Sequence, residues 1–155
     1  GVILASNYAE KIQAWTINTS TAFADVNASA PICKYITVVR DFVVAANISG
    51  TPNKIIWSGL SDETNWTSGA SSQSDYQIIP DGGDITGITG GEYGLVLLEK
   101  AIYRMSYIGS PFFFQFDAIS RNLGCNSPNS ITQYGNMTYF LADDGFYSCD
   151  GQTTL

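Results

Sequence analysis

Short apolar runs recur in pairs along the whole chain, and polar turn residues separate them. No segment keeps apolar residues at the spacing of three and four that marks a helix, so the pattern predicts strands throughout. The first run of each pair begins at residue 2, 42, 95 or 139, at intervals close to the roughly 40–50 residues of one propeller blade. The pairs are 2–5 with 12–15, 42–45 with 55–58, 95–98 with 102–105, and 139–142 with 146–149.

The apolar content of the runs predicts how they are buried. Runs 42–46 and 95–98 are almost continuously apolar, which is typical of strands covered on both faces, whereas β-sandwich strands would alternate more cleanly. A propeller blade needs such cover because it cannot bury its faces alone. We therefore predict an all-β fold of antiparallel β-meander blades, forming part of a β-propeller. The single region 1–155 is expected to hold three to four partial blades, with repeats near 1–35, 36–76, 77–124 and 125–155.

Turn residues predict how the runs are connected. Residues 35–46 are expected to form a hairpin whose turn is Arg40 and Asp41. Residues 18–31 are rich in Ser, Thr, Ala and Asn, and we expect them to connect one blade to the next. Residues 68–74 are mostly Gly, Ser and Ala, which predicts an exposed, mobile linker.

Composition narrows the class of protein. The chain has 155 residues, 14% of them charged and 13% aromatic, so much of its surface is expected to meet other protein. Seven Lys and Arg stand against fourteen Asp and Glu, giving a net charge of −7 with no basic run. Tight nucleic-acid binding is not expected, because phosphate neutralisation needs clustered cations. An acidic surface would instead repel DNA, although negative charge is also the ordinary route to solubility.

Candidate chemistry is sparse. The chain has no histidine, which removes the commonest general base and most zinc sites. Its three cysteines, Cys33, Cys125 and Cys149, form no close pair and are predicted to be buried free thiols. Segments 81–84 and 143–145 have the Asp and Gly content of calcium loops but lack alternate-position acids, so turns are favoured. We expect no metal and no cofactor.

An enzymatic alternative rests on four acids. Asp41, Glu92, Glu99 and Asp117 would serve a glycosidase if two of them lay about 5–9 Å apart, but surface or turn positions are favoured. The aromatic residues would form sugar-stacking platforms in such a protein, while packing between blades is their commoner use. We therefore predict no enzyme and no catalytic residue. A carbohydrate-binding or carbohydrate-active propeller stays open as one alternative, and a non-viral scaffold propeller for peptide partners as another.

The sequence shows no signal-peptide pattern. No apolar stretch has the length of a membrane span, so no membrane partner is expected. The chain begins with Gly1 directly on a strand-like run, and it ends without an obvious stop to the pattern. We expect a fragment or a processed piece of a longer polypeptide.

Three stretches together resemble a known family. They comprise 55–60 with 62–66; then 80–83, 85–88 and 101–105; then 124–125 with 127–128, 139–141 and 144–147. Over roughly residues 36–151, the chain is similar to the propeller-type tail proteins of short-tailed bacteriophages, the tail hub, nozzle or DNA-stabilisation proteins. Full-length members are much longer than this chain. The motifs are structural, and no catalytic residues come with them.

The resemblance implies a structural protein of the virion tail. Such a protein lies below the portal and forms a homo-oligomeric ring, commonly sixfold, around the DNA channel. Its implied partners are the portal or adaptor and other tail proteins, and passing DNA is contacted weakly if at all. If a channel-facing surface lies within this chain, Asp75, Asp81, Asp84 and Glu92 are the candidate lining residues.

Overall fold

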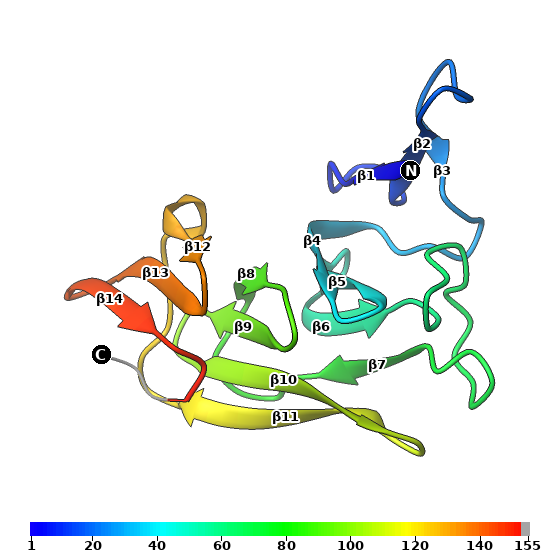
Figure 1. Ribbon diagram of the computed structural model, residues 1–155. Helices are drawn as coiled ribbons and strands as arrows, with labels where there is room; N and C mark the ends of the chain where they lie inside the picture. The colour runs from blue at the N-terminus through cyan, green and yellow to red at the C-terminus, as the bar shows by residue number, and fades with distance from the viewer. Residues whose placement is uncertain (153–155) are drawn as a thin grey trace.

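Fourteen strands and one short 3-10 helix make up the regular structure of residues 1–152, the part that the computed structural model describes (Figure 1). The first half contains β1 (Val2–Ala5), β2 (Gln13–Thr16), β3 (Ala24–Asp25), β4 (Cys33–Val39), β5 (Phe42–Ile48), β6 (Thr51–Trp57) and β7 (Asp75–Ile78). The second half contains β8 (Ile85–Thr89), β9 (Gly94–Leu98), β10 (Ile102–Gly109), β11 (Phe113–Ser120), η1 (Pro128–Ser130), β12 (Thr132–Tyr134), β13 (Met137–Ala142) and β14 (Gly145–Cys149).

The strands form four separate antiparallel sheets. These are β1–β3, β4–β7, β8–β11 and β12–β14, and in each sheet the strands that are adjacent in sequence pair with one another. No sheet closes on itself. The predicted all-β class with antiparallel sheets is confirmed, and so is the hairpin at residues 35–46, where Val39 pairs with Phe42 across the two-residue turn.

Each sheet packs against the next sheet in the chain. The core between the second and third sheets includes Phe42, Val44, Ile55 and Trp57 from one side and Val96, Leu98, Met105 and Phe114 from the other. A smaller core joins Cys33, Ala45 and Ile48 of the second sheet to Ile12 and Ala30, which lie just outside the strands of the first sheet, and Leu4 of β1 packs against it. The core between the third and fourth sheets includes Leu95, Leu97, Ile102, Cys125, Phe140, Ala142 and Cys149.

Strand β9 shows why a continuous apolar run was needed. Val96 and Leu98 belong to the core shared with the second sheet, while Leu95 and Leu97 belong to the core shared with the fourth. Successive side chains of a strand point to opposite faces, so both faces of β9 are buried. All five of its residues are buried, and the prediction of burial on both faces is confirmed.

The backbones of the second and third sheets also touch directly. The N–H of Arg40 donates to the carbonyl of Gly91 at 2.8 Å, and the N–H of Gly91 donates to the carbonyl of Val38 at 3.0 Å. A β-carbon at Gly90 would lie 2.2 Å from the oxygen of Val38. The glycine therefore permits a contact that any side chain would prevent.

Strand β3 lies inside the segment that was predicted as a connection. Gln13 pairs with Asp25, and the Gln13 Nε2 donates to the Asp25 carboxylate at 2.6 Å. The N–H of Val26 donates to the carbonyl of Ile12 at 2.9 Å. The composition of residues 18–31 does not favour a strand. Strand β3 therefore forms because the backbone of β2 offers it hydrogen-bond partners.

The prediction of an exposed linker at residues 68–74 is wrong for its second half. Ser74 is fully buried, and its hydroxyl donates to the carbonyl of Trp57 at 2.8 Å. The indole N–H of Trp57 donates to the carbonyl of Gln73 at 2.9 Å, and the hydroxyl of Tyr107 donates to the side chain of Gln73 at 2.6 Å. Partners distant in sequence anchor this segment, which its composition did not indicate.

Candidate functional site

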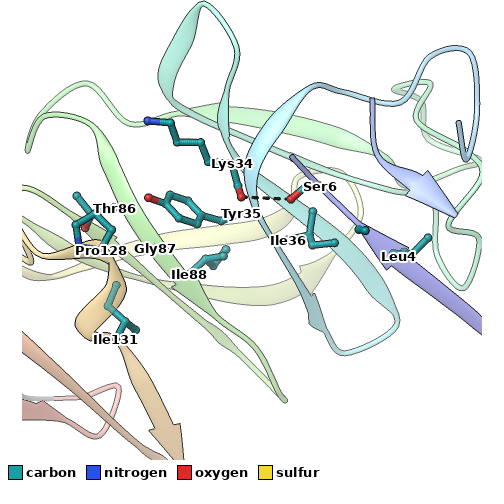
Figure 2. Close-up of a pocket in the computed structure, with 11 residues that line it drawn as sticks. Leu4, Ser6, Lys34, Tyr35, Ile36, Thr86, Gly87, Ile88, Pro128 and Ile131 are labelled. Atoms are coloured by element: carbon teal, nitrogen blue, oxygen red, sulfur yellow. Dashed lines mark hydrogen bonds between the residues drawn. The ribbon is translucent and has the colours of Figure 1, made fainter. Parts of the chain in front are cut away.

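The first strands of three sheets, together with the segment that leads into the fourth sheet, meet around one hollow. In Figure 1, β1, β4, β8 and β12 all lie toward the same open side of the molecule, and β3, β7, β11 and β14 lie away from it. The hollow has a volume of about 470 Å³ and draws on β1, β4, β8 and the segment that leads into β12. Its lining residues are Leu4, Ala5, Ser6, Lys34, Tyr35, Ile36, Thr86, Gly87, Ile88, Pro128 and Ile131 (Figure 2).

A contact between the first two sheets borders the hollow. The hydroxyl of Ser6, just after β1, donates to the backbone carbonyl of Lys34 in β4 at 3.2 Å. The Lys34 ammonium lies 5.0 Å from the centre of the Tyr8 ring, which is cation–π distance. Two residues of the β1–β2 loop therefore hold Lys34 at the hollow.

On the other side, the fourth sheet approaches the third through a glycine. A β-carbon at Gly87 would lie 2.3 Å from the Cδ1 atom of Ile131, so the Ile131 side chain occupies the space that a larger residue in β8 would fill. Figure 2 shows both residues at the same side of the hollow, with Ile88 beside them. The close approach depends on the missing side chain at this position.

The electrostatics of the hollow are mild. Lys34 is the only charged residue among the lining residues, all of which belong to the described part of the chain. Partial burial, followed by the nearby Cys125 thiol, raises the pKa of Tyr35, so its hydroxyl stays protonated at neutral pH. The lining offers hydroxyls and one cation but no carboxylate.

None of the four predicted lining acids lies in the hollow. Glu92 is exposed and forms an ion pair with Arg40 at 3.5 Å. Asp84 is also exposed and directly precedes β8. Asp75 lies in β7, at the opposite edge of the second sheet from β4. The proposal that these acids face a channel stays a prediction, and the structure shows only that they do not line this hollow.

The fourth of these acids, Asp81, belongs to a cluster of its own. Its carboxylate accepts a hydrogen bond from the Tyr103 hydroxyl and forms an ion pair with Arg121 at 2.8 Å. The Tyr103 hydrogen bond, followed by the charge of Arg121, lowers the pKa of Asp81. Burial, together with the same carboxylate, raises the pKa of Tyr103. The cluster joins the turn before β8 to β10 and to the residue that follows β11.

The acids considered for glycosidase chemistry lie on the surface. Asp41 is in the β4–β5 turn, Glu92 and Glu99 are in the turns on either side of β9, and Asp117 is on β11, and all four are exposed. Asp117 accepts both its hydrogen bonds from Gln115, at 2.9 and 3.0 Å. Residues 1–152 contain no cluster of three or more His, Cys, Asp or Glu residues that would hold a metal ion.

The cysteines are structural. Cys33, Cys125 and Cys149 are buried and free, as predicted. Burial raises the pKa of Cys33 to about 12, although a hydrogen bond with Ser6 opposes the shift. Burial also raises the pKa of Cys149. Thiols in this state are poor nucleophiles, because the thiolate is the reactive form.

Sequence reasoning did not find the residues of the hollow. Thr86, Gly87, Ile88 and Pro128 fall within the stretches 85–88 and 127–128 that carry the family resemblance, but nothing in those stretches indicated a shared hollow. Most of the lining residues lie in the first strand of a sheet. Within the described range, no helix is long and apolar enough to cross a membrane. Neither a protein-family model nor a curated protein matches the chain.

Proposed function

We propose that the four sheets are consecutive blades of a β-propeller, and that the protein is a structural component of a phage tail. The observation that carries the proposal is the convergence of β1, β4, β8 and the approach to β12 on one hollow. In a propeller, equivalent strands of successive blades surround the central channel. The packing of each sheet on its sequence neighbours supports the same arrangement, because blades bury their faces against one another.

The resemblance to tail hub and nozzle proteins supplies the biological setting. In this proposal the blades form rigid wall segments of a homo-oligomeric ring in the virion tail, next to the portal or adaptor and other tail proteins. The net charge of −7 keeps passing DNA from binding tightly. That effect belongs to the surface as a whole, since the hollow itself carries Lys34 and no acid.

The mechanism is geometric rather than chemical. Three apolar cores hold the four sheets in fixed relative positions, and the hollow lacks a carboxylate. A wall of this kind keeps solvent out of its packed cores and presents broad surfaces to other proteins. We therefore propose a role without catalysis, metal or cofactor.

Electron cryomicroscopy of the native particle that contains this chain tests the proposal. We expect density for the four sheets within a ring around a DNA-filled channel, with β1, β4, β8 and β12 innermost in their propeller. A solitary closed propeller with an open acidic pocket, outside any virion, would overturn the tail role. It would redirect attention to the carbohydrate alternative.

A further inference from the structure

We propose that a groove between β7 and β11 is a binding site for a neutral glycan. This rim groove has a volume of about 360 Å³ and lies between the last strands of the second and third sheets. The hollow described above is lined by the first strands of the same sheets, so the two sites are on different edges. The residues that carry the proposal are Asp75, Tyr76, Gln77, Phe112, Gln115 and Phe116.

Aromatic rings form the apolar part of the rim groove. Phe112 is 70% exposed and Tyr76 is 50% exposed, while Phe116 is half-buried. Beneath them, the buried Trp57 lies 6.2 Å from the Phe116 ring and 5.1 Å from the Phe114 ring, measured between centroids. The floor is thus held in place by packing. Exposed aromatic faces beside a rigid floor suit the C–H faces of sugar rings.

The polar groups between these rings are mostly acceptors. Asp75 accepts the backbone N–H of Tyr76 with one carboxylate oxygen, at 2.9 Å. The amide nitrogen of Gln77 donates to the carbonyl of Ile78 at 3.1 Å, and that of Gln115 donates to Asp117. Among residues 1–152, no group donates to the second oxygen of Asp75 or to the amide oxygens of Gln77 and Gln115.

These acceptors are open to solvent, and a ligand that brings donors would replace the water on them. A glycan supplies many hydroxyl donors together with apolar ring faces, and it matches both halves of the rim groove. The lining contains no Lys or Arg, so nothing in it would offset the charge of an acidic glycan or a nucleic acid. The nearby Lys54 ammonium is engaged with the Tyr76 ring, 4.2 Å from its centre.

The edge of β7 argues against a peptide strand as the ligand. A peptide that extends a sheet needs free backbone groups along the edge. In β7, the N–H of Tyr76 is occupied by the Asp75 side chain and the carbonyl of Ile78 by the Gln77 side chain. Side chains that occupy edge groups in this way discourage strand addition. The same oxygens and rings remain accessible to a hydroxylated ligand.

The test is a titration of the 155-residue chain with three neutral hexasaccharides, maltohexaose, cellohexaose and mannohexaose, followed by backbone amide chemical shifts in solution. We expect saturable shifts at residues 75–77 and 112–116 with at least one of them. The double variant Tyr76→Ala with Phe112→Ala should weaken that binding at least tenfold. Gln115→Leu, which keeps the bulk but removes the acceptor, should also weaken it. The matched control is Phe146→Ala, which removes a ring that is 85% exposed on β14.

Three results would overturn the proposal. The first is no shift in the rim groove with any of the three sugars at 10 mM, and the second is an equal loss of binding in Phe146→Ala. The third is equal or tighter binding of hexagalacturonate, which would contradict the neutral class. Thermal unfolding of each variant verifies its fold. These results do not depend on the place of the chain in a virion, so this proposal and the tail role fail separately.

Discussion

The contact at Gly90 gives the sharpest test of how the second and third sheets are joined. We expect Gly90→Ala to destabilise the protein, because the added β-carbon would lie 2.2 Å from the oxygen of Val38 and 2.4 Å from the Oγ1 of Thr37. The nearer atom belongs to the backbone and cannot rotate away. The backbone at Gly90 is not in the left-handed region, so the expected cost is steric rather than conformational.

The magnitude follows from two contributions. Forcing one extra carbon into a packed contact costs about 1–3 kcal/mol. The resulting separation strains two hydrogen bonds between the sheets, Arg40 to Gly91 at 2.8 Å and Gly91 to Val38 at 3.0 Å, each worth about 0.5–1.5 kcal/mol. We expect a loss of about 3 kcal/mol in the free energy of unfolding, or a fall in Tm of about 6–12 °C for a chain of this size.

Urea unfolding of the wild type and Gly90→Ala, monitored by circular dichroism, measures the change. The control is Gly69→Ala, where the nearest atom to the added carbon is the Ser72 Oγ at 3.7 Å, an ordinary contact. The control should stay within about 0.5 kcal/mol of the wild type. If Gly90→Ala also stays within that range, the sheets do not approach each other as closely as described, and the reasoning is refuted.

Three further predictions address the other parts of the molecule. Phe140→Ala, in the core between the third and fourth sheets, should lower the free energy of unfolding by about 3–5 kcal/mol in urea, and a loss below 1 kcal/mol would contradict that core. Because the folded protein lowers the pKa of Asp81, the stabilisation from its carboxylate is fully present above its unfolded pKa of about 4 and is lost as pH falls through the lower folded pKa. The difference in stability between wild type and Asp81→Asn should therefore be constant from pH 5 to 7 and shrink below pH 4, and a difference independent of pH would count against the cluster. Since burial raises the pKa of Cys33 to about 12, a thiol reagent at pH 8 should modify it only after unfolding, and rapid labelling of the native chain would contradict its burial.

Several features of the fold follow from local sequence. The continuous apolar run at 95–98 predicted a strand covered on both faces, and alternate residues of β9 do enter two different cores. The residues Arg40 and Asp41 predicted a hairpin turn, and they connect β4 to β5. Burial of Cys33 and Cys149 was also predictable, since Cys149 lies in an apolar run and Cys33 just before one, whereas Cys125 lies in a polar loop and is buried by the tertiary structure. These features were predictable because the spacing of apolar residues and the type of turn residues are visible in a short stretch of sequence.

Other features required the tertiary structure. Strand β3 forms because β2 offers it a partner, and Ser74 is buried because Trp57 binds it from a distant strand. The hollow assembles residues of β1, β4 and β8 with Pro128 and Ile131, which are far apart in the chain, while the predicted acids lie elsewhere. Local pattern determines which faces of a strand are apolar. The stacking of whole sheets and the approach of their backbones determine which side chains converge. Both depend on contacts between residues far apart in the chain.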